Sequence, residues 1–466
     1  MGGLFGCCSK DECVSEVFYG TDYHSHLGTR RGGMAFMDGA DVHRSIHNIE
    51  SDYFRSKFEP NLDKFSGNKG IGVISDNDPQ PLVVNSHLGP FAIVTVGRVV
   101  NMEQLIEQAF ASRNFFTESK IGGASPTELV AMLICQEDSF EAGIRNVQAS
   151  VQGSCSILLL TPQGLWAARD KLGRTPLVIG KKAGAYAVAS ESSSFPNLGF
   201  ELDYFIGPGE AVFIDPEGWE QKLPPGDKMQ VCSFLWVYYG YPASSYENIN
   251  VEAVRYKCGA ALAKNDDVRP DYAAGIPDSG IGHALGYANE KRIPYQRPFV
   301  KYTPTWPRSF MPQNQKVRDL VAQMKLIPVA ELIEGKAPLF CDDSVVRGTQ
   351  LKGTIQGIFK AGAREVHMRL ACPCLIFPCD FLNFSTSQSS MDLIGRRAVM
   401  AMDGGLDKVH DYAVSGRGKK QALNEWIGGE IGLNSLKYQR LEDLVEAIGL
   451  PKSRLCTHCW DGSSYF

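Results

Sequence analysis

Apolar positions in the first half of the chain form short runs separated by turn residues. Runs at 156–160 and 165–169 flank the turn 161–164, and a second such pair surrounds 181–184. This spacing predicts two β-hairpins. Helices are fewer, and the clearest begins at Ser125, where Pro126 and Glu128 complete a capping-box pattern before an apolar run. The first half is therefore predicted to be α+β.

The pattern changes after the turn-rich stretch 223–227. Apolar segments then follow the order helix, strand, loop, helix, strand, which favours a parallel sheet. From about residue 420, the side chains Leu436, Leu441, Leu444, Val445 and Ile448 recur at helical spacing and predict a docked helix. We expect a domain over 1–228, a second over 229–420 and a helical tail over 421–466.

Composition narrows the possible partners. The chain has 466 residues, enough for two or three domains, and its net charge of −5 argues against a general nucleic-acid or anionic-membrane surface. Neither a leader-like segment nor a run of about 18 apolar residues is present. We expect a cytoplasmic protein whose partners are small molecules or further copies of itself in a homo-oligomer. The 13 cysteines are then thiols, and Cys135, Cys155 and Cys258 fit buried apolar positions.

Two loops carry the pattern of phosphate cradles. The apolar run 338–341 predicts a buried strand that delivers Asp342 and Asp343 to its carboxyl end, and Gly348-Thr349 then opens a helix over 350–361. The acidic pair suits ribose hydroxyls or a hydrated Mg²⁺ that holds a diphosphate. A second strand-loop-helix follows the same plan at 275–280. A helix cap with a solvated neighbour would explain one Asp-Asp alone, but the coincidence of both loops favours a ligand.

A pair of thiols lies near the end of the chain. Cys456 and Cys459 have the spacing of half a tetrahedral metal site. The other ligands would come from Cys232, Cys372, Cys374 or Cys379.

These motifs together resemble the glutamine phosphoribosyl-diphosphate amidotransferases of purine biosynthesis, almost from end to end. The resemblance implies an N-terminal nucleophile hydrolase-like α+β sandwich followed by an α/β type I phosphoribosyltransferase domain. It assigns substrate binding to two loops and to a closing loop with its anchor, with Asp342 and Asp343 also at the Mg²⁺. The residues so implied are Asp278, Ser279, Gly280, Asp342, Asp343, Ser344, Arg347, Gly348 and Thr349 in the two loops, and Lys301, Arg308 and Lys325 in the closing loop and its anchor. Two departures stand out: Gln350 replaces a usual Thr, and residues 302–307 contain two prolines in place of a more basic, Gly-containing loop.

The resemblance also selects among the cysteines. The iron–sulfur branch of the family places ligands at positions that match Cys232, Cys379, Cys456 and Cys459. A [4Fe-4S] cluster of structural or oxygen-sensing role is the implied cofactor, with zinc in the same four-thiolate site as the alternative.

The glutaminase half departs from its family at four positions. The segment 2–6 matches a family segment that begins with the nucleophilic cysteine, so Gly2 stands at the nucleophile. Ser75, Val96 and Pro126 stand near the places of the carboxylate-binding Arg, an oxyanion-hole Asn and the ammonium-binding Asp. Cleavage after Gly6 would expose Cys7 as a substitute thiol, but it would restore none of the other three.

We therefore expect a transferase that makes 5-phosphoribosylamine from phosphoribosyl diphosphate, Mg²⁺ and free or delivered ammonia. Lys301, Arg308, Asp342 and Asp343 would carry the catalysis by positioning and charge neutralisation. Two alternatives remain open: a non-catalytic regulator that binds phosphoribosyl diphosphate or a purine nucleotide, and a transferase that uses a different amine.

Overall fold

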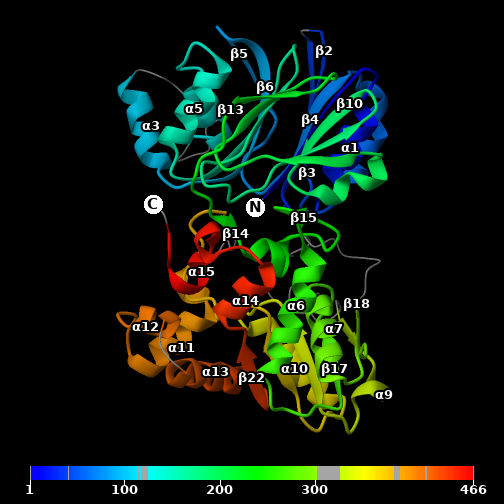
Figure 1. Ribbon diagram of the computed structural model, residues 1–466, viewed down its shortest axis with the longest axis vertical. Helices are drawn as coiled ribbons and strands as arrows, with labels where there is room; N and C mark the ends of the chain where they lie inside the picture. The colour runs from blue at the N-terminus through cyan, green and yellow to red at the C-terminus, as the bar shows by residue number, and fades with distance from the viewer. Residues whose placement is uncertain are drawn as a thin grey trace.

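The computed structural model describes residues 2–39, 41–112, 116, 124–301, 326–382, 389–414 and 417–464. Its two halves lie one above the other along the longest axis (Figure 1). The upper half holds the chain up to β13, and the lower half holds the parallel sheet and the C-terminus. No helix among the described residues is both long enough and apolar enough to cross a membrane.

Two antiparallel sheets face each other in the N-terminal half. The first has the order β11-β9-β10-β1-β4-β2-β3 and the second the order β13-β12-β8-β7-β6-β5. Their strands are β1 (Gly2–Ser9), β2 (Arg31–Asp38), β3 (Asp41–Asn48), β4 (Lys69–Ser75), β5 (Leu82–Ser86), β6 (Gly89–Val99), β7 (Gly153–Leu160), β8 (Leu165–Ala168), β9 (Val178–Lys182), β10 (Ala185–Ala189), β11 (Glu201–Phe205), β12 (Ala211–Ile214) and β13 (Trp219–Leu223).

Helices cover the outer faces of these sheets. A core that includes Leu4, Ile71, Val94 and Leu158 fills the space between the sheets. One outer core lies under α1 (Val14–Asp22) and α2 (Phe54–Phe58). The other lies under α3 (Met102–Ala111), α4 (Pro126–Ile134) and α5 (Phe140–Ser150). The result is a four-layer αββα sandwich, in agreement with the α+β prediction.

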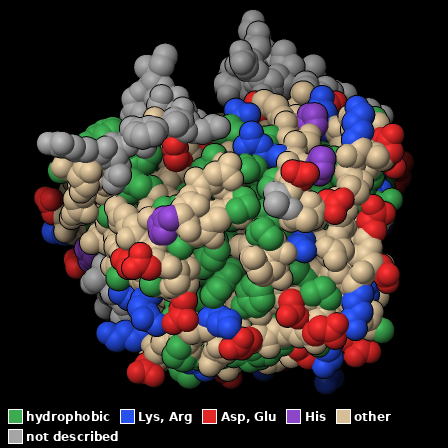
Figure 2. Space-filling view, turned by 90° about the horizontal axis from the view of Figure 1, so that it is seen from above, with side chains coloured by type: hydrophobic (Ala, Val, Ile, Leu, Met, Phe, Trp, Pro, Cys, Tyr) green, Lys and Arg blue, Asp and Glu red, His purple; other side chains and the backbone are tan. Residues whose placement is uncertain are grey.

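Local sequence explains several of these elements. Both predicted hairpins are present, as β7–β8 and β9–β10. The predicted cap of α4 is also confirmed, because the Ser125 side chain accepts a hydrogen bond from the backbone N–H of Glu128. At the end remote from the lower half, acidic and basic side chains are interspersed on the visible surface, with apolar side chains between them (Figure 2).

The lower half is built on a parallel sheet of order β17-β20-β21-β22, which confirms the change of architecture expected after residue 227. The strands are β17 (Tyr272–Gly275), β20 (Pro338–Asp342), β21 (His367–Leu370) and β22 (Ser435–Tyr438). One face packs against α10 (Thr349–Lys360), α11 (Ile394–Asp403) and α13 (Arg417–Ile431), and α12 (Val409–Val414) joins the same core. The other face packs against α6 (Val251–Lys264) and α7 (Gly280–Lys291).

Close approach of α6 and α7 depends on glycine. A Cβ atom on Gly259 would lie 1.9 Å from the carbonyl oxygen of His283, and one on Gly286 would lie 2.0 Å from that of Tyr256. Any larger residue would push the helices apart. The contact holds α7, and with it the loop that precedes α7, against the sheet.

Short elements complete this half. They are β14 (Val231–Cys232), a π-helical turn Leu235–Tyr239, β15 (Ser245–Tyr246), β16 (Ile249–Asn250), β18 (Phe299–Lys301), β19 (Leu326–Pro328), α9 (Ala330–Ile333), α14 (Leu441–Ile448), β23 (Leu455–Cys456) and α15 (His458–Asp461).

The segment predicted as a helical tail differs in part. The expected helix is present as α14, but Leu436 belongs to β22 and not to the helix. Its spacing from Leu441 suits a helix by coincidence. The segment instead pairs with β21, whose backbone N–H and C=O groups would otherwise be left unpaired at the edge of the sheet. The position predicted to separate domain and tail, residue 420, lies inside α13. The last residues therefore add a strand to the sheet as well as helices.

Candidate active site

The two predicted phosphate loops lie side by side at the carboxyl edge of the sheet. β17 and β20 are adjacent and parallel, with Gly275 opposite Cys341. The backbone N–H of Ile276 donates to the carbonyl oxygen of Cys341 at 2.9 Å, which ties one loop to the other strand. A Cβ atom on Gly280 would lie 2.3 Å from that same oxygen, so only glycine fits. Parallel strands bring ligand loops together at this edge.

Asp342 and Asp343 stand where these loops meet. The Ser344 hydroxyl donates to Asp343 Oδ1 at 2.6 Å, and Ser279 from the other loop also hydrogen-bonds the Asp343 carboxylate. Burial, followed by the charge of Asp343, raises the pKa of Asp342 well above its usual range. Burial also raises the pKa of Asp343, against the opposing effects of Ser279, Ser344 and the buried cation Arg255. Paired carboxylates that resist ionising together favour a cation or hydroxyl donors as ligands.

The second loop ends at the start of α10. Gly348 takes the left-handed conformation, with φ of 75°, and Thr349 begins the helix. The free N–H groups of this first turn therefore open at the loop. Arg347 is held by two residues outside the loop. Its guanidinium donates to Asp392 at 2.9 Å, and its carbonyl oxygen accepts from Arg397. The local geometry fits an anion at the helix start.

An ion pair joins the loop 275–280 to β18. The Pro277–Asp278 peptide bond of this loop is cis, and the Asp278 carboxylate pairs with Lys301 at the end of β18. Lys301 lies opposite Leu326 of β19, so the two ends of the predicted closing loop are adjacent. Arg308, Lys325 and the variant segment 302–307 lie outside the described residues.

Arg255 was missed by the sequence reasoning. Its guanidinium, buried in α6, donates to the carbonyl oxygens of Trp236 at 3.2 Å, Tyr238 at 3.1 Å and Gly240 at 2.9 Å. It fastens the π-helical turn to α6 while its charge acts on Asp343. No local motif marks it, since an arginine inside a helix is ordinary.

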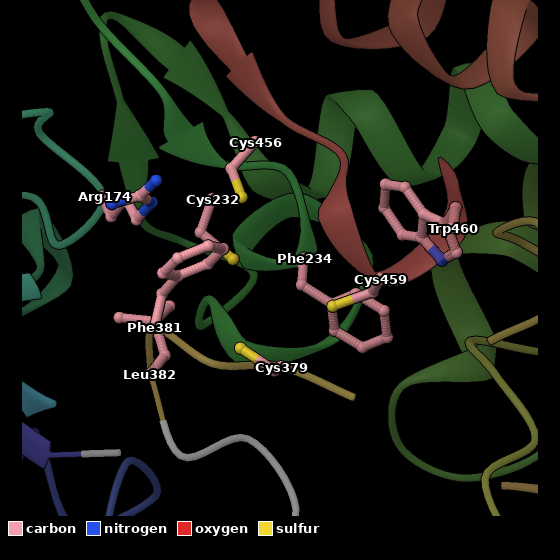
Figure 3. A pocket seen from close by; sticks show the side chains of 9 residues that line it. All are labelled: Arg174, Cys232, Phe234, Cys379, Phe381, Leu382, Cys456, Cys459 and Trp460. Carbon is pink, nitrogen blue, oxygen red and sulfur yellow. The ribbon is translucent and has the colours of Figure 1, made fainter. Parts of the chain in front are cut away.

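The four cysteines selected by resemblance line one cavity (Figure 3). Cys232 and Cys456 are opposite each other where β14 pairs with β23, and Cys459 lies in α15. The carbonyl oxygen of Cys459 accepts from the N–H groups of Ile376 and Phe377, both at 3.1 Å, which brings the segment carrying Cys379 alongside.

The cavity is partly open to solvent, and its other walls are Arg174, Phe234, Phe381, Leu382 and Trp460. Cys372 and Cys374 do not line it. Within the described ranges, no three His, Cys, Asp or Glu side chains converge closely enough for a single metal ion. Burial raises the pKa of Cys232 and of Cys456, which favours the thiol form of both in the absence of a metal. Four thiols around one cavity are a ligand set that suits either an iron–sulfur cluster or zinc.

The position that the sequence resemblance assigns to the nucleophile is occupied by Gly2, and it leaves little room for a side chain. Gly2 begins β1 opposite Ser75 of β4. A Cβ atom on Gly2 would lie 2.5 Å from the carbonyl oxygen of Ile74 and 2.9 Å from Val96 Cγ1. Cys7, the alternative thiol, is fully buried in the middle of the same strand, between Ala187 and Gly70 of the neighbouring strands.

A buried polar network connects the other altered positions. Asp78 accepts hydrogen bonds from the Ser125 hydroxyl and, at 3.0 Å, from the Thr127 N–H, on either side of Pro126. Gln80 donates to Asp78 at 3.0 Å and to Ser75 at 3.4 Å, and accepts from the Thr95 N–H at 2.6 Å. The space around Ser75, Val96 and Pro126 thus satisfies its polar groups internally.

Glu191 ties the two halves together. Its buried carboxylate accepts from the Tyr246 hydroxyl at 2.5 Å and the Tyr241 N–H at 3.2 Å, and lies 3.0 Å from His26 Nε2. Burial alone would raise the pKa of Glu191, but His26, His24 and Tyr246 lower it to about 2. Burial lowers the pKa of His24 to about 4. This network borders a small cavity that also contacts Gly2, Val96 and Arg174.

An αββα sandwich of amidohydrolase type joined to an α/β domain with paired phosphate loops defines a glutamine amidotransferase-like domain coupled to a phosphoribosyl transferase. A profile of the glutamine amidotransferase domain matches residues 69–197. The amidophosphoribosyltransferase of Methanocaldococcus jannaschii is 31% identical over 99% of this chain and 97% of its own length. That of Bacillus subtilis is 28% identical over 96% and 89%. The chain belongs to the amidophosphoribosyltransferase family, the glycosyltransferases of purine biosynthesis.

Solved structures agree with this assignment. The glutamine phosphoribosylpyrophosphate amidotransferase from B. subtilis complexed with ADP and GMP superimposes with a TM-score of 0.83 at 28% identity, over 99% of this chain and 97% of that one. A structure described as the allosteric regulatory enzyme of purine biosynthesis gives 0.83 at 27% identity, over 99% and 96%. These neighbours are consistent with the amidotransferase-type fold predicted from sequence.

Proposed function

We propose that the protein forms 5-phosphoribosylamine from phosphoribosyl diphosphate and ammonia that it does not generate from glutamine. The observation that carries the proposal is the contrast between its halves. The lower half keeps both phosphate loops in contact, whereas the upper half has Gly2 at a position where even a Cβ atom would approach the Ile74 carbonyl oxygen to 2.5 Å.

Different residues of the lower half would bind the phosphates and stabilise the charge that develops on the ribose. The N–H groups at the start of α10 and the loop at Ser279 and Gly280 would hold the phosphates. Asp342 and Asp343 would hold the ribose hydroxyls and stabilise positive charge as it develops at C1 of the ribose. Ammonia forms the new C–N bond at C1 while the C–O bond to diphosphate breaks, and one proton leaves the new ammonium group.

Charge neutralisation of the diphosphate would come from two sources. Asp342 and Asp343, together with the substrate, would hold Mg²⁺, which would supply a divalent charge beside the leaving group. Lys301 would exchange its present partner, Asp278, for a diphosphate oxygen. Arg308 and Lys325 are proposed for the same task on the strength of the sequence resemblance.

The test is an assay of diphosphate release with NH₄Cl and with glutamine, on anaerobically purified protein. We expect turnover with NH₄Cl and none with glutamine. Asp343→Ala should abolish the NH₄Cl activity, and Asp267→Ala, at an exposed carboxylate of the same domain, should leave it unchanged. Comparable turnover on glutamine would refute the loss of the glutaminase, and full activity in Asp343→Ala would refute the transferase site.

Gly2→Cys provides a sharper test of the upper half. Because a side chain at position 2 would strike Ile74 and Val96, and because Ser75 and Pro126 cannot bind the substrate's charged groups, the variant should gain no glutaminase activity. Glutamate release from glutamine, measured with and without phosphoribosyl diphosphate, would show the gain if the pocket were merely missing a thiol.

We also propose that Cys232, Cys379, Cys456 and Cys459 hold a [4Fe-4S] cluster, with zinc as the alternative. The supporting observation is the cavity that their four side chains line. Iron and sulfide content with a visible absorption spectrum would support the cluster, and a colourless protein that contains zinc would exclude it. Cys379→Ser should lose the metal, and Cys372→Ser, outside the cavity, should keep it.

A non-catalytic regulator is the second candidate. Lys301 already forms an ion pair with Asp278 of the loop 275–280, and the segment 302–307 departs from the family pattern. The protein could then bind the substrate without closing the loop over it. Calorimetry that shows binding of phosphoribosyl diphosphate or a purine nucleotide, with no diphosphate release under saturating ammonia, would favour this function.

A further inference from the structure

Arg174 belongs to the upper half of the molecule but lies in the wall of the cysteine cavity of the lower half. It follows β8 in the loop toward β9, and its side chain is 1% exposed. Figure 3 shows its guanidinium directed at the space between Cys232 and Cys456. It is the one cation among the residues that line this cavity.

The guanidinium is fixed on several sides. It donates to the carbonyl oxygen of Gly153 at 2.9 Å and to Gln230 Oε1 at 2.8 Å, and it stacks on Phe381 with 3.8 Å from Cζ to the ring centroid. A further side-chain hydrogen bond reaches the Cys456 thiol. The carbonyl oxygen of Arg174 accepts from the N–H of Cys232 at 3.4 Å. Arg174 thus contacts Cys456 through its guanidinium and Cys232 through its backbone.

A cluster held by four thiolates carries net negative charge, and each electron added makes that charge larger. A buried cation that donates N–H groups to a ligand sulfur stabilises the reduced form more than the oxidised form. Burial strengthens the effect because little water screens the two charges. An exposed lysine at the same distance would act far more weakly.

We propose that Arg174 tunes the cluster, setting its one-electron reduction potential from the neighbouring domain through charge and an N–H···S hydrogen bond to Cys456. The inference rests on the cluster proposed above. Arg174 is a positioning and tuning residue, because it touches the ligand sulfur and not the substrate. The electron comes from an external reductant and enters the cluster without any bond being formed or broken.

The experiment is a redox titration of the anaerobically purified holoenzyme with dithionite and mediator dyes, followed by EPR and visible absorption. Arg174→Gln, which removes the charge, should lower the midpoint potential. Arg174→Lys, which keeps the charge but loses the fork, should remain nearer the wild-type value. Gln230→Leu removes one anchor of the guanidinium but keeps its charge, and it serves as the matched control, with a potential near the wild-type value expected.

The outcomes separate the two proposals. A wild-type protein without iron and sulfide would refute the cluster itself. A fully loaded Arg174→Gln protein with unchanged potential would refute the tuning role. Equal shifts in Arg174→Gln, Arg174→Lys and Gln230→Leu would assign Arg174 to domain anchoring alone and overturn the proposal. If Arg174→Gln fails to fold, Arg174→Met supplies a second neutral variant. The midpoint potentials of Arg174→Lys and Gln230→Leu still separate the effect of charge from that of anchoring.

Discussion

Gly280→Ala tests how closely the two phosphate loops must approach. The added Cβ atom would lie 2.3 Å from the carbonyl oxygen of Cys341, and real Cβ contacts essentially never fall below 3.0 Å, so the loops must separate by about 0.7 Å. Misplacement of about 1 Å costs up to about 100-fold in rate. We therefore expect kcat/KM for phosphoribosyl diphosphate to fall about tenfold to 100-fold, equivalent to about 1.4 to 2.7 kcal/mol.

The assay measures diphosphate release at saturating NH₄Cl, together with calorimetry of phosphoribosyl diphosphate binding. Gly357→Ala is the matched control, because nothing lies within 4 Å of the added atom and the position is inside α10. That control should keep full activity and gain about 0.5 to 1 kcal/mol of stability. A Gly280→Ala enzyme within twofold of wild type in both measurements would refute the idea that contact between the loops shapes the site.

Three further predictions concern stability. The folded-state pKa of His24 is about 4, below its ordinary 6.5, so protonation of His24 favours unfolding. The free energy of unfolding should therefore fall by about 3 kcal/mol as pH falls from 6.5 to 4, and protonation of Glu191 should lower it further below pH 4.5. In urea titrations at a series of pH values, the free energy of unfolding of His24→Gln should depend less on pH than that of the wild type. Asp266→Asn should cost roughly 3 to 5 kcal/mol, because Arg369 donates to both Asp266 oxygens, at 2.5 and 2.9 Å, in a fully buried pair. An Asp266→Asn protein as stable as wild type would contradict this. Ser125→Ala removes a helix cap and a bond to a buried carboxylate, and thermal unfolding should report a loss of about 1 to 2 kcal/mol.

Features set by neighbouring residues were predicted well. The two hairpins, the cap at Ser125 and both strand-loop-helix units follow from turn residues, apolar runs and glycine positions within a few residues of one another. The acidic pair at the end of β20 was found for the same reason. Leu436 shows the limit of this approach, because its helical spacing is outweighed by pairing with a strand distant in sequence.

Groups that act through distant contacts carried no local signal. Arg255 and Arg174 look like ordinary surface residues in the sequence, yet both are buried and reach carbonyl oxygens or sulfurs on other segments. Asp78 and Gln80 likewise lie in the connection between β4 and β5, from which they bind the N–H groups of Thr127 and Thr95. Only the folded chain brings such partners together, so spacing along the sequence could not identify them.

The pairing of β14 with β23 bears on how the protein is synthesised. Cys232 lies just after the upper half, whereas Cys456 and Cys459 come much later in the chain, after β22 and α14. During synthesis the upper sandwich and the strands up to β21 can fold while the cysteine cavity is still open. The cavity is therefore completed only when β23 pairs with β14, so a group held by its four cysteines would enter the protein after both segments have been synthesised.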